Sequence, residues 1–159
     1  MKLGIGLVAT VALLLTSACT GDKPAVAQPA ADGPEPKTIE GARAAAQTVF
    51  DRFSGGDFAG AWELYSAAGK QAITQDDYVR LNQACARRGL AIQVSSARMD
   101  GDGRAVVIAK QLMAAQSYTM IYEDGGWRLA PAREGLALYR LGAARAIAAQ
   151  KKAGTCAGR

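Results

Sequence analysis

The chain has 159 residues, half of them apolar, and a formal net charge of +5 at pH 7. This length allows one domain of roughly 100 residues with a hydrophobic core, once the N-terminal region described below is set aside. Over residues 38–139, basic and acidic side chains are equal in number, so the excess positive charge lies after Tyr139. We expect no nucleic-acid partner, because domains that bind nucleic acids concentrate basic side chains on the folded surface.

The first residues have the pattern of an export signal. Lys2 precedes an uncharged apolar run over residues 3–15, which is shorter than the roughly 20 residues that a membrane-spanning helix needs. Small residues then lead directly to Cys19 in the sequence Thr-Ser-Ala-Cys. This segment resembles the lipobox of bacterial lipoproteins, which implies that residues 1–18 are a signal peptide and that Cys19 receives a diacylglycerol thioether. The alternative is an ordinary secretory signal followed by a chance cysteine.

Residues 19–37 are rich in proline, alanine and small polar side chains and have no apolar periodicity. Such composition is typical of a disordered linker. We therefore expect a tether that separates a folded domain, at residues 38–134, from the outer face of the cell membrane.

Helical periodicity predicts three helices at the start of this domain. The first follows Thr38, a favourable N-cap residue, and ends at residues 54–56, which are Ser-Gly-Gly. The second helix follows Asp57 and the third follows Thr74. Residues 67–70 break the apolar pattern between them.

After Gly89 the apolar period changes from helical to alternating, which predicts four strands. We expect them at residues 90–94, 104–113, 118–122 and 127–129, joined by glycine-containing turns at residues 100–103 and 123–126. Helices followed by an antiparallel meander are typical of an α+β fold in which the helices pack on one face of the sheet.

Residues 135–159 are rich in alanine and are expected to form a basic C-terminal helix and tail. Arg140, Arg145, Lys151 and Lys152 fall on one side of that helix at about 100° per residue. We expect this side to be solvated; the alternative is a contact with anionic lipid head groups.

Cys85 and Cys156 remain once Cys19 is assigned to the lipid. An even pair of cysteines in an oxidising compartment predicts a disulfide, and two free thiols are the alternative. The chain has no histidine and no cysteines at metal-site spacing, so we expect no zinc site. Residues 100–103 lack the further ligands of a calcium loop and are expected to form a turn. We expect no metal and no cofactor.

Several short motifs together resemble the nuclear transport factor 2-like superfamily. They are Gly56, Asp57 and Phe58; Ala61, Trp62, Glu63 and Leu64; Tyr78; and Gly125, Gly126, Trp127, Arg128 and Leu129. The resemblance implies a curved sheet that wraps the long first helix into a cone, often with an apolar pocket at the open end. The superfamily includes both enzymes and non-catalytic binding domains, so the fold alone does not give a function.

The candidate residues favour binding over catalysis. Without histidine there is no Ser-His or Cys-His pair, and helix capping or turn formation accounts for most carboxylates. We therefore expect no catalytic residue. The inward-facing aromatic residues are expected in the core; the functional alternative is that four of them line a pocket for an apolar or amphipathic ligand. These four are Trp62, Tyr65, Tyr78 and Tyr122.

From the sequence we expect an exported, lipid-anchored, non-catalytic protein that binds a small apolar ligand or an envelope protein. One alternative is a small isomerase- or hydrolase-like enzyme with Asp and Tyr in the cone, for which Asp51, Tyr65, Tyr118, Tyr122 and Glu123 are the available residues. Another is a spacer or interaction module for envelope proteins, which predicts a filled cone and an exposed apolar patch.

Overall fold

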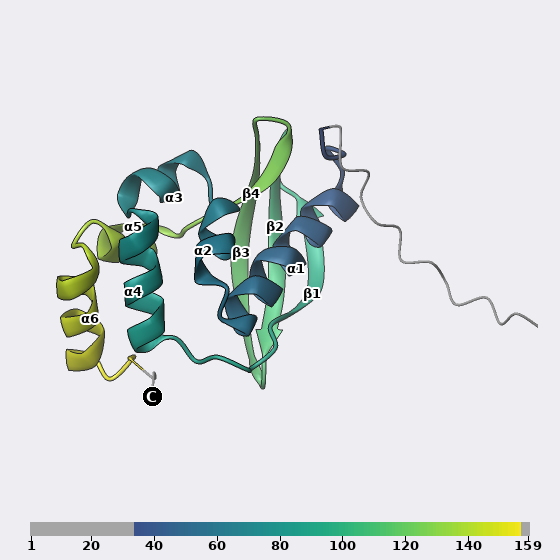
Figure 1. The fold of residues 1–159 in the computed structure, drawn as a ribbon. Helices are drawn as coiled ribbons and strands as arrows, with labels where there is room; N and C mark the ends of the chain where they lie inside the picture. The colour runs from purple at the N-terminus through teal and green to yellow at the C-terminus, as the bar shows by residue number, and fades with distance from the viewer. Residues whose placement is uncertain (1–33, 157–159) are drawn as a thin grey trace, which may run out of the picture.

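The computed structural model describes residues 34–156 (Figure 1). The predicted signal peptide at residues 1–18, the predicted lipidation at Cys19 and most of the predicted tether at residues 19–37 lie outside the described residues. Among the helices of the described part, none has the length and apolar character needed to cross a membrane.

Within residues 34–156, four helices precede the sheet: α1 (Ile39–Gly55), α2 (Phe58–Glu63), α3 (Ala67–Ala72) and α4 (Gln75–Cys85). Three of them begin after the N-cap residues expected from the sequence, and each capping side chain accepts a backbone N–H bond. The short helix α3 lies where the sequence predicted a break. It forms because the buried Ser66 caps it, accepting a bond of 3.3 Å from the Gly69 N–H.

The strands are β1 (Gln93–Met99), β2 (Arg104–Gln111), β3 (Ala114–Glu123) and β4 (Gly126–Ala130). They form an antiparallel sheet in the order β1-β2-β3-β4, which confirms the predicted α+β class with helices before a meander. β4 pairs with β3 only from Thr119 onward. In the described structure, the first half of β3 therefore has no strand partner on the β4 side.

The core lies between α1 and one face of the sheet (Figure 1). Small and medium side chains of α1 allow close packing: Ala42, Ala46, Val49 and Phe50 are buried. Alternate residues of β2 face them, as the period of a strand requires. These facing residues are Ala105, Val107 and Ala109.

The C-terminal segment forms two helices, α5 (Arg133–Tyr139) and α6 (Ala143–Lys152), where the sequence predicted one. Gly142, at φ 73°, separates them. Side chains of both helices join the core cluster, so residues 135–156 pack with the predicted domain. The sulfur atoms of Cys85 and Cys156 lie 1.99 Å apart, at the distance of the predicted disulfide, and this pairing places the end of α6 beside α4.

Candidate ligand-binding site

A cleft runs along the half of β3 that β4 leaves uncovered. Its volume is about 650 Å³, and it is lined by residues 116–119 of β3 and residues 130–133 at the start of α5. Arg104 and Arg133 are the charged lining residues, and none of the described residues that line the cleft carries a carboxylate. The cleft is therefore positive.

A smaller cavity of about 170 Å³ lies beside this cleft, between α1 and the sheet, and we call it the inner cavity. Val49, Phe50 and Phe53 of α1 line it together with Tyr118 and Leu129 of the sheet. An apolar cavity of roughly 150 Å³ is large enough to bind benzene. The inner cavity therefore has room for about one ring-sized apolar group.

Four side chains line both the cleft and the inner cavity: Tyr65, Tyr118, Leu129 and Tyr139. They come from the α2–α3 connection, β3, β4 and α5. The site is thus an open positive cleft next to a small apolar chamber.

The hydroxyl groups of Tyr65, Tyr78 and Tyr139 form hydrogen bonds with one another. The Tyr65 and Tyr78 hydroxyl oxygens are 3.0 Å apart, and those of Tyr65 and Tyr139 are 3.4 Å apart. The ring centroids of Tyr65 and Tyr78 lie 5.1 Å apart in an edge-to-face arrangement, which is favourable for aromatic pairs. A buried phenol needs a hydrogen-bond partner, and in this cluster each phenol supplies one for another.

Burial raises the pKa of the Tyr65, Tyr78 and Tyr139 phenols well above the ordinary tyrosine value. The coulombic effect of a neighbouring tyrosine raises the pKa of each phenol further. Burial also raises the pKa of Tyr118. At physiological pH these hydroxyls are therefore neutral. They are poor proton acceptors, and the two hydrogen bonds among Tyr65, Tyr78 and Tyr139 leave one O–H proton of that cluster free to donate to a ligand.

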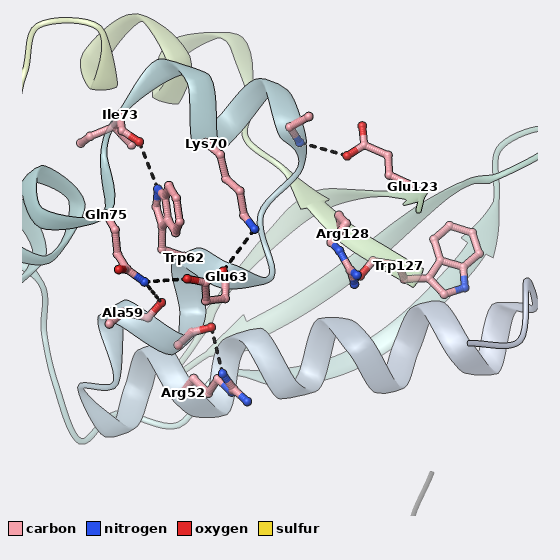
Figure 2. A network of polar contacts seen from close by, with 12 residues as sticks. Arg52, Ala59, Trp62, Glu63, Lys70, Ile73, Gln75, Glu123, Trp127 and Arg128 are labelled. Atoms are coloured by element: carbon pink, nitrogen blue, oxygen red, sulfur yellow. Dashed lines mark hydrogen bonds and ion pairs between the residues drawn. The ribbon is translucent and has the colours of Figure 1, made fainter. Parts of the chain in front are cut away.

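The structure brings only part of the predicted pocket set to this site. Tyr65 lines both spaces, and Tyr78 reaches it through the hydroxyl bond to Tyr65. Trp62 lies outside: its indole N–H donates to the Ile73 carbonyl at 3.1 Å (Figure 2), which joins α2 to the end of α3. Tyr122 lies toward the far end of β3, where its hydroxyl donates to the Glu35 carbonyl at 2.6 Å.

The predicted pocket set omitted Tyr118 and Tyr139. The alternating pattern of β3 placed Tyr118 on the same face as Met120 and Tyr122, so its inward position was available from the sequence. Tyr139 had no such signal, because it ends α5, in a segment expected to be a separate tail. Its position depends on how α5 packs, which periodicity does not reveal.

The acidic residues near the site have structural partners. Glu123 accepts a 2.9 Å bond from the Ala67 N–H at the start of α3, and Glu63 accepts a 2.9 Å bond from the Gln75 side chain (Figure 2). Asp51 is exposed on α1 and accepts a 2.8 Å bond from Gln47. None of the three lines the cleft or the inner cavity. Over residues 34–156, no three His, Cys, Asp or Glu side chains gather as a metal site would require.

Comparisons with known proteins give no assignment. The chain matches no model of a protein family, no curated protein and no solved structure. The cleft, the chamber and the side chains that line them are therefore the features of this chain that bear on its function.

Proposed function

We propose that this chain is an exported, lipid-anchored protein that binds an amphipathic ligand at the outer face of the cell membrane, without catalysis. The observation that carries the proposal is the juxtaposition of a positive cleft with a small apolar chamber. An acidic group of the ligand would lie near Arg104 and Arg133. Its apolar part would enter between Tyr65, Tyr118 and Tyr139.

The donor chemistry of the site supports a ligand that accepts hydrogen bonds. Guanidinium groups are permanently charged donors and match carboxylate or phosphate oxygens. The Tyr65, Tyr78 and Tyr139 phenols add one further donor, because two of their three O–H protons bond within the cluster, and Tyr118 already donates to Gln116 at 2.8 Å. Arg133 is exposed, whereas Arg104 also pairs with Asp100 at 3.1 Å. Arg133 is thus the arginine better placed to recognise an anionic group.

We also propose that the domain is nuclear transport factor 2-like. Support comes from the long α1 packed against a four-stranded antiparallel meander, with a chamber between them. The motif residues Gly56, Asp57 and Phe58 lie at the step from α1 to α2, and Trp127 is buried in β4.

The enzyme alternative receives less support from the site. A general base must reach the proton that it removes and must have a pKa near the working pH. The nearby carboxylates bond to backbone or side-chain donors outside the cavity, and the tyrosines have a raised pKa. The spacer alternative is favoured by one observation, the exposed apolar side chains of Leu112 and Met113.

The anchor is tested by a native mass spectrum of the protein taken from membranes of its host without reductant. We expect a mass that lacks residues 1–18, is raised by a diacylglycerol and is lowered by two protons for the Cys85–Cys156 disulfide. An unlipidated mass would contradict the anchor.

The ligand is tested in the same spectrum, as a small molecule released by mild activation. Arg133→Glu should reduce its occupancy about tenfold, because a hydrogen bond to a charged group contributes about 1.5–3 kcal/mol. Arg140→Glu is the matched control, because Arg140 is exposed at the end of the same helix but lines neither space. Equal occupancy in the two variants, or lipidated protein without any bound molecule, would reject the ligand site.

A further inference from the structure

The turn between β2 and β3 exposes two large apolar side chains. Leu112 is 72% exposed and Met113 is 99% exposed. Leu112 has φ 53°, a left-handed conformation that disfavours leucine and suits glycine or asparagine. The β3–β4 turn has suitable residues instead, Asp124 and Gly125 at φ 49° and 78°. Neither packing nor backbone geometry accounts for a leucine at position 112.

Unpaired cations lie at the same end of the molecule as this turn. Lys110 lies at the end of β2, and Gln111 ties the segment after α4 to the turn by donating to the Leu90 carbonyl at 3.1 Å. Figure 1 shows the C-terminal ends of α4 and α6 at the same end of the molecule as this turn. Exposed basic side chains at this end make no ion pair within residues 34–156. They are Arg87, Arg88, Lys110, Lys151 and Lys152.

The opposite end of the domain is different. Its basic side chains have ion-pair partners: Lys37 with Asp102 at 2.8 Å, Arg98 with Asp100 at 3.0 Å, and Arg128 with Glu35 at 3.8 Å. The described chain also begins there, because the Glu35 N–H bonds to the Gly125 carbonyl in the β3–β4 turn. The predicted tether thus joins the neutralised end.

Two acidic residues lie in the half of the domain that contains the unpaired cations. They are Asp51 and Asp57, near the C-terminal end of α1. Asp57 caps α2 through the Gly60 N–H, and Asp51 accepts from Gln47. The cations outnumber them, so this end keeps a positive charge.

We propose that this end, which we call the basic tip, docks on an anionic lipid surface of the membrane that carries the anchor. The basic tip consists of Leu112, Met113 and the five unpaired cations named above. The proposal rests on the lipid anchor of the proposed function. Leucine and methionine would enter the boundary of the acyl chains, and the cations would lie at the level of anionic head groups.

A lipid surface fits the basic tip better than a protein partner does. The apolar pair stands on a protruding turn, and the cations come from three separate segments that end at the same end of the molecule, with α6 on the far side of α4 from the sheet (Figure 1). Long, exposed cationic side chains spread over one end of the domain match a flat anionic layer. An acidic protein partner is the other occupant that the test must distinguish.

The length of the N-terminal chain allows such docking although the tether joins the opposite end. Cys19 and Pro34 are fifteen positions apart, a stretch of chain that can span at most about 50 Å. The ten residues of β3 extend over about 33 Å. An anchored domain can therefore turn the basic tip toward the bilayer.

The test uses the lipidated full chain, with its anchor verified by mass, in vesicles that contain brominated phosphatidylcholine. Met113→Trp places a fluorophore at the basic tip, and Glu40→Trp places one on the exposed side of α1 near the tether. The vesicles contain equal parts of phosphatidylcholine and phosphatidylglycerol, or phosphatidylcholine alone. We expect bromine to quench Met113→Trp, but not Glu40→Trp, in the anionic vesicles.

Charge reversal then tests the electrostatic part in the Met113→Trp background. Removing one cation near an anionic surface should reduce the ratio of docked to undocked domain about fivefold. Because Lys110→Glu reverses the charge, it should reduce this ratio at least as much. Arg43→Glu is the matched control, an exposed charge reversal on the first half of α1. The proposal would be overturned if Met113→Trp were not quenched or were quenched equally in neutral vesicles. It would also be overturned if Lys110→Glu and Arg43→Glu reduced the quenching equally. Cross-linking of the unquenched tip to an acidic protein in native membranes would also overturn it. Failure of the anchor itself would appear separately, as an unlipidated mass.

Discussion

At the scale of single residues, the tyrosine cluster is the feature that most affects both stability and binding. Tyr65 and Tyr78 are buried and Tyr139 is partly buried, and the pKa of each phenol is raised because burial disfavours the anion. The cluster can stay neutral over a wide pH range. It therefore keeps its two internal hydrogen bonds, and one O–H proton is left to donate beside the cleft.

The raised pKa values predict alkaline instability. In the unfolded chain each phenol releases its proton near pH 10, whereas the folded protein keeps it. The free energy of unfolding is therefore unaffected below about pH 9 and falls as the pH rises further, by about 1.4 kcal/mol per pH unit for each buried tyrosine. Three tyrosines should give a slope near 4 kcal/mol per pH unit, and Tyr78→Phe should reduce that slope by about a third. Urea unfolding measured at a series of alkaline pH values would show this, and an unchanged slope in the variant would contradict it.

At the scale of elements, α6 depends on its packing and on the cystine more than on its own sequence. Its N-cap residue is Gly142, which offers no side-chain cap. It packs on α4 through Ala143 and Ala146, both buried, and alanine buries little area. The Cys85–Cys156 pair closes a loop with a sequence separation of 71 residues.

Loss of this disulfide should therefore destabilise the domain considerably. In the chain-entropy model a loop of this length contributes about 4 kcal/mol. Cys85→Ser with Cys156→Ser should lower the free energy of unfolding by about that amount in urea titrations, and amide exchange in α6 should rise most. Reductant should lower the stability of the parent protein and leave the double variant unchanged. A double variant as stable as the parent would show that packing alone holds α6.

The elements that the sequence predicted correctly are those with local signals. N-cap residues Thr38, Asp57 and Thr74 mark the starts of three helices, and alternating apolar residues mark β2. The break at Gly142 and the helix α3 were missed. Glycine also occurs inside helices, and the six residues of α3 give too short a window for periodicity.

The candidate site was harder to predict than the fold. Its lining joins residues from α1, the α2–α3 connection, the sheet and α5, and Tyr139 meets Tyr65 only because α5 packs beside α3. The sequence pattern of an inward-facing aromatic residue is the same whether the residue lines the site or packs elsewhere. Trp62 and Tyr122 instead bond the backbone elsewhere, at Ile73 and Glu35.

At the scale of the whole molecule, the two proposals place the cleft close to the bilayer. Tyr118 follows Met113 by five residues on β3, a distance of about 17 Å along a strand. If the basic tip docks, the cleft opens near the head groups, where an amphipathic ligand would be concentrated. Docking and loading should then be coupled, although no residue of the basic tip lines the cleft.

This coupling predicts a loss of ligand from a variant whose site is intact. Lys110→Glu should lower the occupancy of the small molecule in protein taken from native membranes, up to about fivefold if loading requires docking. Arg43→Glu, an equal change of charge on α1, should leave occupancy unchanged. Native mass spectra of the two variants and the parent, prepared side by side, measure the effect. Equal occupancy in all three would mean that the cleft fills independently of docking, and the ligand would then reach it from the aqueous side.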